Sequence, residues 1–162
     1  MNEIEFYNPI FQEFLTKFEK ELEGTNYGVE FGFIAGDIEG SCTDPKDVLL
    51  ELVPDQVSSV TKVSKVSGRH FLAEIKSKIL MKDFDGMYPD HYNTKLIQKI
   101  RNERLPKLES HIRNFLTLNN ANCYKTDGLP GMPFLDIIWS FCYLLIEPER
   151  KRALIIHGGA SD

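Results

Sequence analysis

The chain has 162 residues, of which 42% are hydrophobic and 27% charged, with a net charge of −5 at pH 7. This size and composition are typical of one globular domain with a sizeable core, so we expect a single domain over residues 1–162. No run approaches the roughly 18 apolar residues of a membrane-spanning helix. The start carries Glu3 and Glu5 where a signal peptide would be basic, which predicts a cytoplasmic protein without a membrane partner.

The charge is distributed unevenly along the chain. Residues 1–55 carry 13 acidic groups against three lysines, a net −10, whereas the remainder carries 16 basic and 11 acidic groups, a net +5. An acidic first third disfavours nucleic acid as the partner of that surface and favours a basic protein. The alternative is a solvated face that serves only to keep the protein soluble.

The first element is an amphipathic helix that Asn8 can cap, with Pro9 at its first position and Gly24 after its end. Its apolar residues recur at helical spacing: Ile10, Phe11, Phe14, Leu15, Phe18 and Leu22. Alternation in "NYGVEFGFIAG" then predicts a strand with one face on the core.

The stretch "FIAGDIEGSCTDPKDVLLE", residues 33–51, contains five carboxylates. We expect Asp44 to cap a short helix whose apolar side is Val48, Leu49 and Leu52 and which Pro54 ends. Gly36 and Gly40 would let the preceding loop turn sharply. The remaining acidic residues are Asp37, Glu39, Asp47 and Glu51.

Helices dominate the middle of the chain. Valines at 57, 60, 63 and 66 recur every three residues and favour a helix, although their β-branched character argues for a strand. A clearer helix is expected over 69–82, and the composition of "DFDGMYPDHYN" is typical of a loop. Two more helices follow, separated by a break or kink at Pro106.

The last third predicts a β-hairpin. "FLDIIWSFCYLLI" is apolar on both faces, as in a central strand, and "RALIIHGG" returns as its partner after the turn "EPERK". The fold class expected is therefore α+β, with helices packed on a mostly antiparallel sheet that includes this C-terminal hairpin.

No pattern typical of a catalytic or metal site is present. The phosphate-binding glycine motifs are missing, and the three cysteines have neither disulfide nor zinc-site spacing, so Cys142 should simply pack. Asp83, Asp85, Asp90 and His91 share one loop, but it has no glutamate where a calcium loop needs one. The C-terminal His157, Ser161 and Asp162 are too close to the chain end for a rigid triad. The histidines at 70, 91 and 111 are expected on the surface.

We therefore expect that the protein is not an enzyme and that it binds neither a metal ion nor a cofactor.

The C-terminal "IIWSFCYLLIEPERKRALIIHGGASD", together with the size and acidity of the chain, resembles immunity proteins of bacterial polymorphic toxin systems, including contact-dependent growth inhibition. The resemblance implies an antitoxin that binds and neutralises a cognate toxin domain. Such domains are often nucleases, which are basic because they hold a polyanion.

We therefore expect a partner-binding surface formed by Asp37, Glu39, Asp47 and Glu51, with Tyr27 and Tyr88 as aromatic anchors. Two alternatives stay open. One is a small enzyme that uses the pair Asp37 and Glu39, or the loop 83–91, for acid–base chemistry. The other is a regulatory module that binds its own copies through the edge of the C-terminal hairpin.

Overall fold

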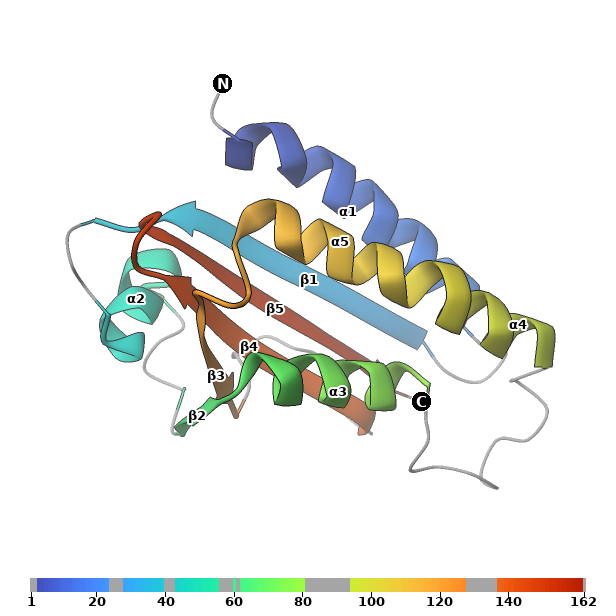
Figure 1. Ribbon diagram of the computed structural model, residues 1–162. Helices are drawn as coiled ribbons and strands as arrows, with labels where there is room; N and C mark the ends of the chain where they lie inside the picture. Colours follow the sequence, from blue (N-terminus) through green and yellow to red (C-terminus); the bar gives the residue numbers. More distant parts are fainter. Residues whose placement is uncertain are drawn as a thin grey trace.

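The computed structural model describes residues 3–23, 28–39, 43–55, 60, 62–80, 94–127 and 137–161. This part forms a five-stranded antiparallel sheet, in the order β1-β5-β4-β3-β2, with helices against both faces (Figure 1). The predicted α+β class is confirmed. The elements are α1 (Glu3–Leu22), β1 (Gly28–Asp37), α2 (Pro45–Leu52), β2 (Val63–Val66), α3 (Gly68–Ile79), α4 (Thr94–Lys99), the π-helical turn η3 (Ile100–Arg104), α5 (Leu105–Phe115), β3 (Asn122–Thr126), β4 (Ile137–Glu147) and β5 (Arg152–Ser161).

The predicted C-terminal hairpin is the centre of the sheet. β4 and β5 pair from Trp139 opposite Ala160 to Glu147 opposite Arg152, and β1 pairs along the other side of β5. Tyr143, Leu144 and Leu145 are all fully buried, so consecutive side chains are covered on opposite faces. An apolar run of this kind is the pattern of a strand enclosed from both sides.

The larger core lies between the sheet and the helices α1, α3 and α5, which cover the face seen in Figure 1. Aromatic rings fill its middle: Phe18 stacks on Phe31 with centroids 5.4 Å apart, and Phe71 meets Tyr143 edge-on at 4.9 Å. Such contacts add to the free energy of area burial. The other principal members are Phe11, Phe14, Leu15, Ile75, Leu108, Ile112, Phe115, Trp139, Phe141, Leu145, Leu154 and Ile156.

Helix α2 covers part of the opposite face. Its buried Val48 and Leu49 pack with Cys142, Leu144 and Ile155 of the central strands. Gly36 lies within β1, and a Cβ atom there would be 2.8 Å from Leu52 Cδ2. The expectation that this glycine serves a sharp turn is therefore wrong; it permits close packing of α2 on the strand. Gly40 lies outside the described residues.

The helix expected from the valine spacing is wrong where the structure describes it. Val63–Val66 is the edge strand β2, paired with β3, so β-branched content outweighed the three-residue period. β3 itself carried no clear pattern in the sequence. It is recognisable only from its place between β4 and β2.

Helix α1 begins at Glu3, earlier than predicted, and Pro9 lies inside it. Ile4 is buried and Tyr7 packs edge-on against Phe115, so tertiary contacts hold the extra turn. Pro9 is exposed, and the backbone bond it lacks would reach the carbonyl of exposed Glu5, which water can satisfy. Near Pro106 the chain does not break: η3 leads directly into α5, with the proline in its first turn.

His111 is not on the surface, contrary to the sequence-based expectation. It is 8% exposed, with its ring 4.8 Å from that of Phe14 and 5.3 Å from that of Phe11. Burial, with a smaller effect from Lys107, lowers the pKa of His111 below its usual value. Exposed His70 agrees with the prediction, and position 91 lies outside the described residues.

We predict that His111→Phe reduces the acid sensitivity of the fold. With its folded pKa depressed, His111 takes up a proton more readily in the unfolded chain, so wild-type stability falls as the pH drops below about 6.5. Urea unfolding at pH 7 and pH 5 should show a smaller loss of unfolding free energy for the variant. Equal losses in both proteins would contradict this account.

A second prediction concerns Gly158, at the centre of β5. A Cβ atom there would lie 2.5 Å from Phe31 Cδ1 and 2.8 Å from Phe141 Cζ. Gly158→Ala should therefore destabilise the fold by about 1–3 kcal/mol in urea unfolding, since the packed rings must move. Gly28→Ala is the matched control, because a Cβ atom at that position would have no neighbour within 4 Å. Similar effects of the two substitutions would refute the packing argument.

Candidate protein-interaction surface

The end of β1 and the helix α2 together present an acidic surface. Asp44 caps α2 as predicted, accepting the backbone N–H of Lys46 at 2.9 Å. Glu51, near the end of the helix, accepts the N–H of Glu39 at 2.7 Å. This bond fixes the chain that leaves β1 against α2, so Glu39 and Glu51 lie close together, with exposed Asp47 on the same helix.

Leu50 lies on the outer side of α2 and is 54% exposed, although α2 buries Val48 and Leu49 on its inner side. Its neighbours in the helix are Asp47, one turn before it, and Glu51. A single exposed leucine is normal on a protein surface, and here it offers apolar contact area directly beside carboxylates. Leu50 was not among the residues predicted from sequence. The helical spacing could have identified it: because Val48, Leu49 and Leu52 form the buried side of the helix, the side chain at position 50 must point outward.

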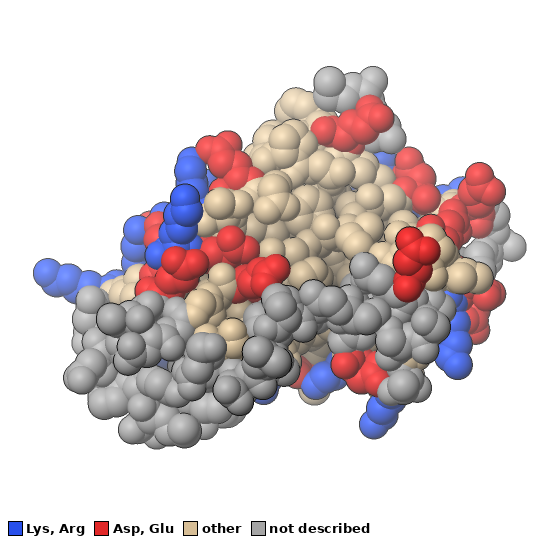
Figure 2. All heavy atoms as spheres, turned by 180° about the vertical axis from the view of Figure 1, so that it is seen from behind, with Lys and Arg blue, Asp and Glu red and all other residues tan. Residues whose placement is uncertain are grey.

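Figure 2 shows the face of the molecule opposite to α1 and α5. Carboxylates are spread around an area of uncharged residues, with Lys and Arg gathered mainly toward the sides. Helix α2 packs on this face of the sheet, and its exposed Asp47 and Glu51 therefore contribute acidic groups to it.

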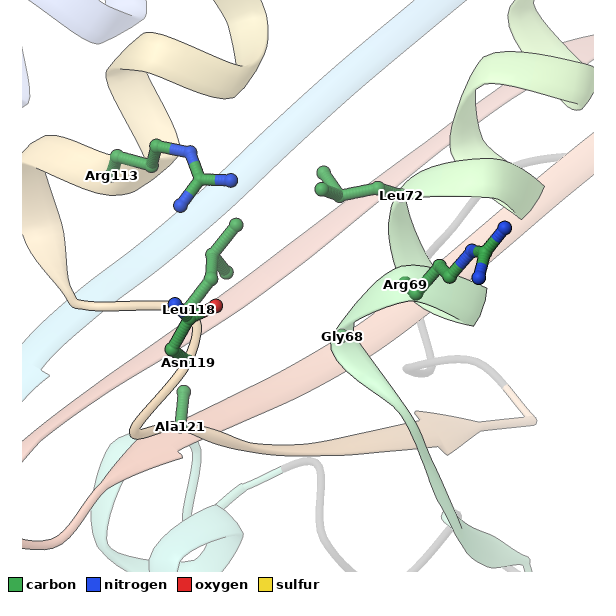
Figure 3. A pocket seen from close by; sticks show the side chains of 7 residues that line it. All are labelled: Gly68, Arg69, Leu72, Arg113, Leu118, Asn119 and Ala121. Atoms are coloured by element: carbon green, nitrogen blue, oxygen red, sulfur yellow. The ribbon is translucent and has the colours of Figure 1, made fainter.

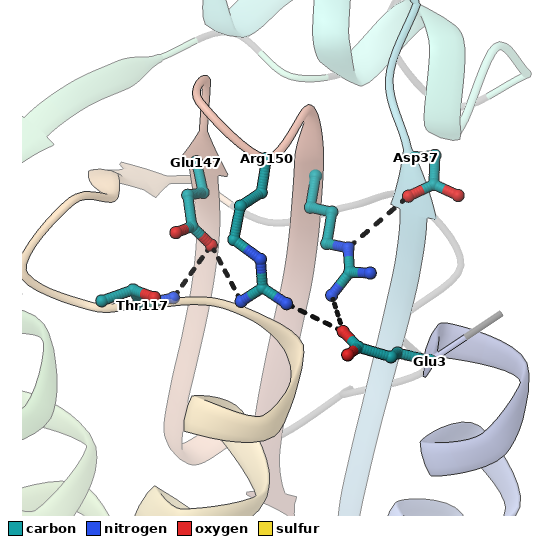
Figure 4. A network of polar contacts seen from close by, with 6 residues as sticks. Glu3, Asp37, Thr117, Glu147 and Arg150 are labelled. Carbon is teal, nitrogen blue, oxygen red and sulfur yellow. Dashed lines mark hydrogen bonds and ion pairs between the residues drawn. The ribbon is translucent and has the colours of Figure 1, made fainter.

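Asp37 differs from the other predicted acidic residues because it pairs with an arginine of β5 that belongs to the network in Figure 4. Arg152 Nε is 3.7 Å from Asp37 Oδ1, and Arg152 Nη1 is 2.7 Å from Glu3 Oε2. Arg150 also binds Glu3, at 2.8 Å. The hydrogen bond from Arg152 lowers the pKa of Glu3. Asp37 therefore belongs to a network that joins α1 to the central hairpin, and its charge is partly neutralised.

Glu147 is the buried member of the same network and is 1% exposed. Its Oε2 accepts the N–H of Thr117 at 2.9 Å and lies 3.6 Å from Arg150 Nη1. Glu147 thereby links the end of β4 to the chain that follows α5 (Figure 4). Nothing in the sequence distinguishes this glutamate from its exposed neighbour Glu149, because the difference arises from the chain packed over it.

The two aromatic anchors proposed from sequence, Tyr27 and Tyr88, lie outside the described residues, as does the loop 83–91. Among the residues that are described, no group of three His, Cys, Asp or Glu side chains is placed to hold a metal ion. In that same part of the chain, no helix is long and apolar enough to cross a membrane.

One pair of potentially reactive groups was not anticipated: Cys142 and His157 lie directly opposite each other on β4 and β5. The imidazole fits because Gly32 has no side chain; a Cβ there would be 2.3 Å from His157 Nε2. Burial raises the pKa of the Cys142 thiol to about 11 and lowers that of His157. Both groups are therefore neutral at pH 7, and the reactive thiolate is not populated. Packing, as predicted for Cys142, accounts for the pair.

A five-stranded antiparallel sheet with its long helices on one face defines an α+β class that is also found among solved structures. Two crystal structures of citrus MAF1 share it. One has a TM-score of 0.56 and 14% identity, covering 91% of this chain and 99% of that chain. The other, in a different space group, has a TM-score of 0.55 and 15% identity, covering 91% and 98%. No family model and no curated protein matches the sequence. At this level of identity the likeness establishes the fold.

The comparison corrects the functional expectation. The two structures that share the fold are of MAF1 and not of an immunity protein, so the interpretation as a toxin-neutralising immunity protein or antitoxin is wrong. The cognate toxin domain is wrong as the expected partner for the same reason. Those two structures are of a regulatory protein and not of an enzyme, as is expected here from the sequence. The regulatory module, one of the two alternatives to that interpretation, fits the comparison better.

We predict that Glu147→Ala destabilises the protein by about 1–3 kcal/mol, because the buried carboxylate no longer accepts the N–H of Thr117 or pairs with Arg150. The measurement is the free energy of unfolding from urea titration. Glu149→Ala, in the exposed turn two residues later, is the control and should change stability by less than about 0.5 kcal/mol. Equal effects of the two substitutions would show that the buried contact contributes little.

Proposed function

We propose that this chain is a regulatory protein that acts by binding a component of the transcription machinery, and that it does not act by catalysis. The observation that carries the proposal is the shared fold with citrus MAF1, which extends over 91% of this chain and 99% of that chain. Coverage of this extent means that the whole fold, and not one motif, is common to both. MAF1 is a repressor of RNA polymerase III, and we propose the same class of target here.

The acidic surface is the site that we propose contacts the partner. Proteins that hold nucleic acid present basic surfaces, because they must neutralise phosphates. A surface formed by Glu39, Asp47 and Glu51 has the complementary potential, and long-range attraction would speed the encounter. Leu50 is half exposed among these carboxylates. It would be the apolar anchor that slows dissociation of the complex. Asp37 would contribute less, since Arg152 lies beside it.

The proposal is tested with the purified chain and RNA polymerase III from the organism that encodes it. We expect the chain to co-elute with the polymerase and to reduce transcription of a tRNA gene in a reconstituted system. A chain that neither binds the polymerase nor changes transcription at micromolar concentration would overturn the proposal. The cytoplasmic location expected from sequence remains a prediction, to be checked by imaging a tagged chain.

The contact surface is tested with the double variant Asp47→Lys/Leu50→Asp. We expect a loss of affinity for the polymerase of about tenfold or more, because an anchor and a complementary charge are removed together. Glu23→Lys is the control: it changes an exposed carboxylate at the far end of α1 and should leave affinity nearly unchanged. If the control weakens binding as strongly as the double variant, net charge and not this surface determines the interaction.

A further inference from the structure

A second surface, of opposite charge, lies between α3 and α5. A cavity of about 480 Å³ opens there, lined by Gly68, Arg69, Leu72, Arg113, Leu118, Asn119 and Ala121. Figure 3 shows that its residues come from three places: the first turns of α3, the end of α5 and the turn that leads into β3. The volume is within the range of sites that accept a side chain or a small ligand, about 300–1,000 Å³.

The floor of the cavity is aliphatic. Leu118 is 6% exposed, and Leu72 and Ala121 are half-buried and pack against the main core. In Figure 3 the guanidinium group of Arg113 extends from α5 toward Leu72, across the space above this floor. A ligand that filled the cavity would therefore meet apolar carbon on one side and a cation on another.

The described residues around the cavity leave its positive charge uncancelled. Arg113 Nη2 binds Glu109 Oε1 at 2.7 Å, but the same carboxylate also binds Lys76 Nζ at 3.0 Å, so one negative charge faces two positive ones. Arg69 is exposed and forms no ion pair with any described residue. The cavity therefore carries a local excess of positive charge that favours an anionic ligand.

The surroundings extend this positive field. By sequence, residues 60–127 carry 13 basic and seven acidic groups, a net +6, whereas residues 3–55 are net −10. In the helix layer α5 lies between α1 and α3, and Glu21 of the acidic α1 is already paired with Lys99 and Arg104 (Figure 1). An acidic ligand would be drawn to the side of α3 and away from that of β1.

Two kinds of polyanion fit such a charge, and the lining distinguishes them. Nucleic acid binders present arrays of Lys and Arg with exposed aromatic rings for the bases, whereas this cavity has an aliphatic floor and two arginines. The net charge of −5 also repels an extended polyanion. An acidic peptide needs only a short positive site, and an aliphatic side chain between its carboxylates would fill the floor.

We propose that this cavity binds an acidic segment of a partner protein, with an aliphatic side chain of the segment on Leu72, Leu118 and Ala121 and its carboxylates on Arg69 and Arg113. The inference rests on the proposed function, since it gives the regulator a second contact with its target. The two surfaces would bind chemically opposite parts of that target, which fixes the orientation of the complex.

The test uses fluorescence anisotropy with a labelled nonapeptide built from repeats of aspartate, glutamate and leucine. We expect saturable binding to the wild-type chain, a loss of affinity of about tenfold or more in Arg69→Glu/Arg113→Glu, and retained affinity in Lys95→Glu/Arg101→Glu. The control pair makes the same change of charge at exposed positions that do not line the cavity. Ala121→Phe, which fills the cavity without altering charge, should also abolish binding; circular dichroism confirms that each variant is folded.

Three outcomes would overturn the inference. They are no binding by the wild-type chain, equal loss in both charge-reversal pairs, and equal affinity for a peptide in which serine replaces leucine. A single-stranded RNA of 20 nucleotides is run in parallel; if it binds and the peptide does not, the surface is a nucleic-acid site and the inference is wrong. The assay contains no polymerase, so its failure is distinct from failure of the proposed function.

Discussion

The constraint on which this fold depends is that β4 and β5 are apolar on both faces and must be covered on both. Tyr143 and Leu145 need the layer of α1, α3 and α5, while Cys142 and Leu144 need α2 on the other side. The aromatic rings on the helix-covered face leave so little space that any side chain at position 158 would force them to move. The placement of α2, which carries the acidic surface, is therefore a consequence of core formation.

Hydrogen bonds and ion pairs of glutamate side chains fix the positions of the helices and strands that this core brings together. Glu21 at the end of α1 binds Lys99 at 3.0 Å and Arg104 Nε at 2.6 Å, joining α1 to the segment before α5. Glu74 of α3 accepts the hydroxyl of Tyr143 and the ammonium of Lys125; although burial raises its pKa, these bonds leave it lowered. Each such group is half-buried at a junction between layers. Hydrophobic contact alone does not specify register in this way, because it has no direction.

The charge is distributed unevenly along the chain, although the acidic α1 packs beside the basic α5 and is joined to its start through Glu21. The acidic elements α1, β1 and α2 occur first in the chain, and the basic elements α3 to α5 follow, with β1 and β2 at opposite edges of the sheet. Each side combines charge with an apolar contact: Leu50 on α2, and the aliphatic floor between α3 and α5. A protein that presents two such surfaces is suited to hold a larger partner in one orientation.

The sequence by itself determined the α+β class, the helix over Phe11–Leu22, the strand from Val29 and the C-terminal hairpin, because their apolar periods are local and strong. It also determined the cap at Asp44, whose bond reaches only two residues. Only the tertiary structure decided that Val63–Val66 is a strand, that His111 and Glu147 are buried and that Arg152 accompanies Asp37. These depend on partners distant in the chain: β3 for the valines, α1 for the histidine, the chain after α5 for the glutamate. The function inferred from composition was wrong for a related reason, since charge and size are shared by many folds, whereas the order of strands and the helices that cover them are not.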